Sequence, residues 1–274
     1  ERGALAAAAT LAVAPPARAK PAPTCDESIT TLQRGDQKVV VIGTAHVSKV
    51  SAELVGETMD AVRPTLLMLE LDRKRVRGLP EAAPEGGAAP PPPPKKPSLG
   101  ARVGGALVGS VLSSMYRSLD KLGLDSGAEF AVVLDRSKMA GIPVLLADRD
   151  VDETLQRVSE AVKATSSVDL ARFDAAAGDL FKGDFSFDSK ASVTAGVELV
   201  KKRENVRALV NALSETLPDI YSALVDERDE YMARSLLTKL DKAGPQRVVC
   251  VVGIAHEDGI CRRLAASGFR QRVC

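Results

Sequence analysis

Short apolar runs alternate with longer amphipathic stretches along most of the chain. The apolar runs are short and rich in Val, Ile and Leu, as in buried strands, and cover residues 38–42, 66–69, 142–147 and 247–252. The stretches with apolar residues at helical spacing cover residues 52–62, 128–140 and much of 151–240. Strands that alternate with helices predict an α/β fold with a parallel sheet and right-handed crossovers. A short closing helix is expected at 260–266, and a hairpin is expected around Arg34-Gly35-Asp36.

The only two histidines of the chain occur in two copies of one motif. The copies are Val-Val-Val-Ile-Gly43-Thr44-Ala45-His46 and Val-Val-Cys-Val-Val-Gly253-Ile254-Ala255-His256. Each copy predicts a buried strand, then a glycine where the backbone turns, then an imidazole. Because α/β proteins build ligand sites at the carboxyl ends of strands, the motif pair predicts two imidazoles at one sheet edge. Histidine is the commonest metal ligand and a common general base.

Charged residues follow two other predicted strands and gather on a late helix. These residues are Glu70 and Asp72, the triplet Asp148-Arg149-Asp150, and Glu227-Arg228. Two imidazoles with a carboxylate suit Zn, Mn, Fe or Co, and they also suit a metal-free general base. An arginine beside them could hold a substrate carboxylate or phosphate, or stabilise an oxyanion.

Each of these groups also has a purely structural explanation. His46 could cap a helix or lie satisfied in the core, and Glu70 with Asp72 could cap the turn that follows them. The triplet 148–150 could be a local ion pair that opens the next helix. The charge run 227–230 has the pattern of a solvated helix face, and periodicity alone favours that interpretation.

Two segments fall outside the predicted folded unit. Residues 1–28 combine a basic residue, an Ala-rich apolar core and Ala17-Arg18-Ala19, a pattern typical of targeting sequence or of a disordered tail. An organelle lumen is therefore expected, with the chloroplast favoured and a mitochondrial or secretory destination as alternatives. Residues 80–98 contain five consecutive prolines and predict an exposed polyproline insertion. The folded domain is expected over residues 29–274, without a transmembrane helix.

Composition limits the possible function classes. The 37 Lys and Arg residues nearly balance the 36 Asp and Glu residues, which argues against a general nucleic-acid binder. The four cysteines, Cys25, Cys250, Cys261 and Cys274, form no CxxC pair, so a zinc ribbon is not expected. Cys250 lies in a predicted strand as a small buried residue. The others are free thiols or pair in an oxidising compartment.

Five motifs in order resemble the TraB domain family, which is similar to bacterial pheromone-shutdown proteins and TIKI proteases. The motifs are Gly-Thr-Ala-His, Leu-Glu-Leu-Asp, Asp-Arg-Asp, Leu-Val-Asp-Glu-Arg-Asp-Glu-Tyr-Met and Gly-Ile-Ala-His. The resemblance runs from about residue 38 to residue 268, and the proline-rich insertion interrupts it. It implies a three-layer α/β/α fold with a mixed, largely parallel sheet.

The resemblance also implies which residues form the site. His46 and His256 would be metal ligands with the strand-end carboxylate of Glu70, for a divalent metal such as Mn, Co or Zn. Glu227 and Arg228 carry over as an acidic-basic helix pair, which overturns the solvated-face interpretation. The glycines Gly43 and Gly253 and the pair Asp148 and Arg149 complete the candidate site.

The leading hypothesis is a metal-dependent hydrolase that acts on a peptide, a small ester or an amide. In it, Glu70, Glu227 and Arg228 are the catalytic candidates. The alternative is a non-catalytic regulatory protein that sequesters a peptide or small-molecule ligand through the same cleft. A third interpretation is a scaffold whose Pro90 to Pro94 segment binds an SH3- or WW-type partner.

Overall fold

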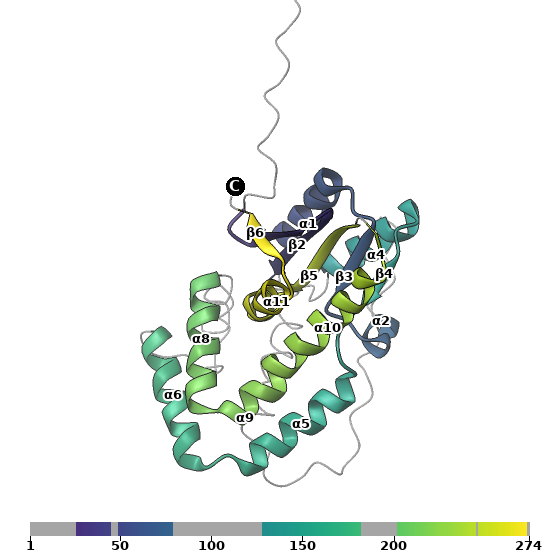
Figure 1. Ribbon diagram of the computed structural model, residues 1–274. Helices are drawn as coiled ribbons and strands as arrows, with labels where there is room; N and C mark the ends of the chain where they lie inside the picture. Colours follow the sequence, from purple (N-terminus) through teal and green to yellow (C-terminus); the bar gives the residue numbers. More distant parts are fainter. Residues whose placement is uncertain (1–25, 45–48, 79–127, 182–201, 245, 273–274) are drawn as a thin grey trace, which may run out of the picture.

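The computed structural model describes residues 26–44, 49–78, 128–181, 202–244 and 246–272 (Figure 1). Its centre is a mixed six-stranded sheet in the order β4-β3-β5-β2-β1-β6. The strands are β1 (Ile29–Arg34), β2 (Gln37–Thr44), β3 (Leu66–Leu69), β4 (Val144–Leu146), β5 (Gln246–Gly253) and β6 (Arg270–Arg272). Strands β4, β3, β5 and β2 are parallel to one another, whereas β1 is antiparallel to both β2 and β6.

The two Gly-x-x-His motifs follow neighbouring strands. β2 pairs with β5 along its whole length, and in this register Thr44 lies opposite Gly253 and Gly43 lies opposite Val252. The two motif glycines are therefore one residue apart in register, on adjacent parallel strands. This arrangement brings both motifs to the same edge of the sheet, as the sequence predicts.

Helices cover both faces of the sheet, so the expected three-layer α/β/α fold is confirmed (Figure 1). Alternate strand residues such as Val40 and Val249 pack against α1 (Lys49–Val62) and α4 (Ala128–Ala140). Their neighbours Val41 and Cys250 pack against α10 (Glu227–Asp241) and α11 (Ile254–Ala266). The central strands are apolar throughout because both of their faces are covered.

A helical arm extends from the carboxyl side of the sheet (Figure 1). It consists of α5 (Val151–Ala164), α6 (Ser167–Phe181), α8 (Arg203–Thr216), α9 (Pro218–Tyr221) and the π-helix η2 (Ser222–Asp226). Its own apolar cluster joins Val158 and Val162 of α5 to Ile220 and Ala223. The arm returns to the sheet through η2, which leads directly into α10, so the arm ends at the candidate site.

The structure differs from the sequence-based expectations in a few elements. Strand β5 lies between β2 and β3, so these two strands are not neighbours although both are parallel to β5. Helix α11 begins at Ile254 rather than near residue 260, which places His256 in its first helical turn. The short helix α2 (Arg73–Gly78) and the strand β6 were not expected. β6 is the exposed polar sequence Arg-Gln-Arg, which carries no apolar strand signal.

Several expectations concern residues outside the described ranges. They include almost all of the N-terminal segment 1–28 and the proline-rich insertion 80–98. No helix in the described ranges is long and apolar enough to cross a membrane. Cys250 and Cys261 are free thiols, and Cys250 is buried as expected.

Candidate functional site

Five charged or polar side chains meet at the carboxyl ends of β3, β4 and β5. Glu70 follows β3, Asp148 follows β4, and His256 lies in the first turn of α11 after β5. Arg228 and Asp229 come from the first turn of α10. We call these five residues the Arg228 cluster. All five side chains are buried or nearly buried, so each must find its partners inside the protein.

The Arg228 guanidinium is the centre of this cluster. Its Nη2 lies 2.5 Å from Glu70 Oε1 and 2.6 Å from Asp148 Oδ2, and its Nε donates to Asp148 Oδ1 at 3.1 Å. Only 12% of the Arg228 side chain is exposed. Burial opposes its charge, but the charges of Glu70 and Asp148 prevail and raise the pKa of Arg228 above its ordinary value. Arg228 is therefore a buried permanent cation that neutralises buried carboxylates.

The π-helix η2 provides backbone acceptors for two arginines. Arg228 Nη1 donates to the Leu224 carbonyl at 3.1 Å, and Arg149 Nη2 donates to the Ala223 carbonyl at 2.9 Å. Short π-helical turns occur frequently at functional sites. In this chain, the π-helical turn joins the helical arm to the helix that carries Arg228.

The His256 ring lies between two carboxylates. Its Nδ1 lies 2.6 Å from Asp229 Oδ1, and its Nε2 lies 3.3 Å from Glu70 Oε1 and 2.9 Å from Arg228 Nη1. Burial lowers the pKa of His256, but the Glu70 charge and the bond to Asp229 outweigh it and raise the pKa to about 9. An unprotonated Nε2 accepts the Arg228 N–H, whereas a protonated Nε2 has Glu70 as its acceptor. A proton that arrives at Nε2 is therefore stabilised within the cluster.

Glu70 also joins the two ends of the second motif. While Oε1 faces Arg228 and His256, Oε2 accepts the backbone N–H of Gly253 at 2.6 Å. Gly253 caps the amino end of α11. One carboxylate thus fixes the start of the helix that carries His256.

Glu227 and Arg149 lie in a separate ion cluster. Arg149 Nη1 reaches Glu227 Oε2 at 2.5 Å, and Arg157 makes two bonds of 2.5 Å to the same carboxylate. Among the described residues, no hydrogen bond or ion pair joins Glu227 to His256, Glu70 or Arg228. Asp229, two residues later, is the carboxylate of α10 that contacts His256.

Two site residues were not singled out from the sequence. Asp229 lies within the charge run of α10, and Glu257 directly follows His256. Glu257 is almost fully buried, accepts the Thr30 hydroxyl at 2.6 Å and forms an ion pair with Arg203. Burial raises the pKa of both carboxyls. The sequence offered one sign of both residues, since Asp229 directly follows Arg228 and Glu257 directly follows His256. A charged residue at these positions is equally typical of a solvated helix face.

Two glycines leave room for these buried carboxylates. A Cβ at Gly43 would lie 2.6 Å from Glu257 Oε2, and a Cβ at Gly259 would overlap Asp229 Oδ2. The first contact links the glycine of one motif to the residue that follows the other motif. Backbone conformation does not require glycine at either position, so the requirement comes from packing.

His46 lies outside the described residues, so its predicted meeting with His256 stays a prediction. Within the described ranges, no three His, Cys, Asp or Glu side chains are placed to hold a metal ion. His256 Nε2 and Glu70 Oε1 are already in contact with Arg228, and a metal bound to both atoms would have to displace the guanidinium. The described residues alone therefore do not fit a metal, and the ligand set His46, His256 and Glu70 remains a prediction.

The TraB/PrgY/gumN family model matches residues 28–272, which is nearly the whole described structure. This chain belongs to the TraB/PrgY/gumN family. It is 29% identical over 232 residues to an uncharacterised protein of Methanocaldococcus jannaschii, with 82% of this chain and 53% of that protein covered. It is also 26% identical to the TraB domain-containing proteins of Mus musculus and Homo sapiens, over 269 and 263 residues. Both alignments cover 89% of this chain and 67% of the mammalian protein.

These matches identify the family and leave the activity open. The chain spans about half the length of the Methanocaldococcus protein and about two thirds of the mammalian ones. The fold and the clustering of Glu70, Arg228 and His256 agree with the motifs that carried the family resemblance.

We predict that Gly259→Ala destabilises the protein because the added methyl group overlaps Asp229 and pushes its carboxylate away from His256. Displacement of a buried hydrogen-bonded carboxylate costs about 1–3 kcal/mol. Chemical denaturation of the wild type and the variant measures this loss. Gly178→Ala is the matched control, since Gly178 is also helical and a Cβ there meets nothing within 4 Å. Helix propensity favours alanine at both positions, so equal effects at the two sites would contradict the packing argument.

We also predict that the stabilising effect of Glu227 depends on pH. Arg157 and Arg149 hold the pKa of Glu227 below its ordinary 4.5. The stabilisation of the folded state by the Glu227 carboxylate is therefore complete above the pKa that Glu227 has in the unfolded chain. It is lost as the pH falls through the lower pKa that Glu227 has in the folded protein. The difference in unfolding free energy between wild type and Glu227→Gln should shrink between pH 7 and about pH 3.5. Glu215→Gln, at an exposed position, is the control, and a constant difference for Glu227→Gln would rule the effect out.

Proposed function

We propose that this chain is a hydrolase of peptides or of small esters or amides, with His256 as the residue that moves the proton. The observation that supports this proposal is the set of contacts made by the two nitrogens of the His256 ring. Asp229 holds Nδ1 at 2.6 Å, and Nε2 faces Glu70 and Arg228. A carboxylate that fixes one ring nitrogen orients the other nitrogen, which exchanges a proton with a substrate or water that displaces the Arg228 N–H.

The proposed reaction is addition of water to a carbonyl group followed by loss of the leaving group. The reactive form has an unprotonated Nε2, and its population grows as the pH rises toward the His256 pKa of about 9. The water oxygen forms a bond to the carbonyl carbon while one water proton passes to Nε2 of this form. The resulting imidazolium is stabilised by Glu70 and Asp229. Collapse of the tetrahedral intermediate breaks the bond to the amine or alcohol, which takes the proton from Nε2 and leaves a carboxylic acid product.

Arg228 contributes a positive charge close to the place where the carbonyl oxygen would develop negative charge. All five of its N–H groups already have partners within the protein, so this effect is electrostatic and adds no hydrogen bond to the substrate. A permanent cation in a water-poor site stabilises such a charge more in the transition state than in the ground state. Glu70 and Asp148 hold the guanidinium at 2.5 and 2.6 Å, so it needs little reorganisation during the reaction. Glu70 is a positioning residue in this account, and so is Asp229.

A divalent metal held by His46, His256 and Glu70 remains part of the proposal, with Mn, Co or Zn as candidates. Such an ion would polarise the carbonyl group and lower the pKa of a bound water. Because Arg228 contacts two of the three ligand residues, the proton transfer is assigned to the protein's own side chains. Metal content of the purified protein, compared with that of His46→Ala, tests this part separately.

Removal of the imidazole or its orienting carboxylate should abolish most turnover. Hydrolysis of internally quenched peptides and of p-nitrophenyl acetate is measured for wild type, His256→Ala and Asp229→Asn, each checked for folding by circular dichroism. We expect each variant to lose about a hundredfold or more in kcat, since general-base catalysis contributes on that order. Glu230→Gln is the control, because Glu230 is the next residue and is exposed.

Two outcomes would count against this function. Equal activity in wild type and folded His256→Ala would remove His256 from the mechanism. Stoichiometric binding of a peptide without turnover by any metal-loaded form would favour the alternative, a regulatory protein that sequesters its ligand in the same site.

A further inference from the structure

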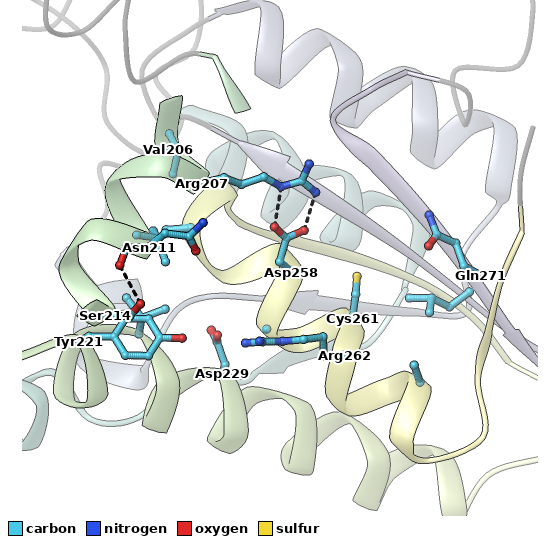
Figure 2. Close-up of a pocket in the computed structure, with 16 residues that line it drawn as sticks. Val206, Arg207, Asn211, Ser214, Tyr221, Asp229, Asp258, Cys261, Arg262 and Gln271 are labelled. Atoms are coloured by element: carbon cyan, nitrogen blue, oxygen red, sulfur yellow. Dashed lines mark hydrogen bonds and ion pairs between the residues drawn. The ribbon is translucent and has the colours of Figure 1, made fainter. Parts of the chain in front are cut away.

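A pocket of about 520 Å³, which Asp229 helps to line, lies between α8, η2 and α11 (Figure 2). We call it the α8–α11 pocket. Its volume is within the range of small-molecule sites, about 300–1,000 Å³. Neither Glu70, Arg228 nor His256 lines it, so it is distinct from the proposed catalytic site. The two sites share one residue, Asp229.

Asp229 brings an unpaired carboxylate oxygen to this pocket. Its Oδ1 is bonded to His256, whereas its buried Oδ2 has no hydrogen-bond partner. Oδ2 lies against Gly259, and both Asp229 and Gly259 line the pocket. A buried oxygen without a partner costs about 1–3 kcal/mol, which a donor from a ligand would offset.

A cation without a hydrogen bond to the described residues lines the same pocket. The exposed Arg262 lines the pocket from α11, and within the described part of the chain its guanidinium has no hydrogen bond or ion pair. The Tyr221 hydroxyl also lacks a hydrogen bond to the described residues. Figure 2 shows the Tyr221 hydroxyl, the Asp229 carboxylate and the Arg262 guanidinium pointing toward one another. The pocket therefore offers opposite charges side by side.

The other charges of the pocket neutralise one another, and part of its wall is apolar. Arg207 and Asp258 form a two-bond ion pair at 2.6 Å each across the pocket (Figure 2). Val206, Val210 and Val225 line the wall with aliphatic surface. The free recognition groups are thus one carboxylate oxygen, one guanidinium and an aliphatic surface.

We propose that the α8–α11 pocket binds a free α-amino acid with an aliphatic side chain. In this compound, an ammonium and a carboxylate are attached to the same carbon, which matches adjacent Asp229 and Arg262. The ammonium donates to Asp229, the carboxylate accepts from Arg262, and the side chain packs on the valines. A peptide separates its two terminal charges and fits this pair less well. Because Asp229 also holds His256, an amino acid in the pocket acts on the carboxylate that orients the imidazole.

The test is direct binding by isothermal titration calorimetry, with L-leucine, L-valine and L-isoleucine as probes. At least one of them should bind saturably below about 10 mM. 4-Methylpentanoic acid lacks the ammonium of leucine, and 3-methylbutylamine lacks its carboxylate. Each analogue should bind about tenfold or more weakly than leucine, since it loses one charged contact.

Arg262→Gln should weaken amino-acid binding about tenfold, because it removes the carboxylate partner at an exposed position that the fold does not need. Arg172→Gln, on the exposed surface of α6, is the control and should bind as the wild type does. No saturable binding of the three amino acids overturns the proposal. Equal binding of leucine and its analogues, or unchanged binding by Arg262→Gln, also overturns it. The assay needs no turnover, so its outcome is independent of the proposed hydrolysis.

Discussion

The Arg228 guanidinium is the interaction on which the candidate site depends. Glu70 and Asp148 follow adjacent parallel strands and are buried where those strands end, so their charges would repel one another without a cation between them. Arg228 supplies that cation from α10 and also contacts His256. Removal of one partner from such a buried set leaves an uncompensated charge, at a cost of about 3–5 kcal/mol. The packing of α10 and the neutralisation of the Glu70 and Asp148 charges therefore depend on each other.

The parallel sheet provides the geometry for this coupling. Glu70, Asp148 and His256 follow strands β3, β4 and β5 and therefore lie at one edge of the sheet. Two glycines leave space for two further buried carboxylates beside them. Gly43 makes room for Glu257, and Gly259 makes room for Asp229. Asp229 then faces two ways, toward the imidazole and toward the α8–α11 pocket. A ligand in that pocket and a substrate at His256 would share one carboxylate.

Hydrophobic pattern was sufficient to predict much of the fold. The apolar runs at 38–42, 66–69 and 247–252 became β2, β3 and β5 because both faces of these strands are covered by helices. Strand order was not predictable, because no local feature of 246–253 places β5 between β2 and β3. The early start of α11 was missed because the motif Gly-Ile-Ala-His does not itself carry a helical signal.

The candidate site was predicted in part. The strand-end positions of Glu70 and Asp148 and both motif glycines follow from where apolar runs stop. The family resemblance was needed to include Arg228, since its charge run looks like a solvated face. The separation of Glu227 from Asp229 could not be foreseen. Helical residues two positions apart point in different directions, and only packing decides which one meets His256.

The most direct test of the central claim is a double-mutant cycle between Arg228 and Glu70, measured by chemical denaturation. We expect Arg228→Met to cost about 3–5 kcal/mol of unfolding free energy in the wild-type background. In the Glu70→Gln background the same change should cost less by about 1–3 kcal/mol, because one carboxylate no longer needs the cation. Costs that add within about 0.5 kcal/mol would show that the two charges are not coupled and would contradict this account.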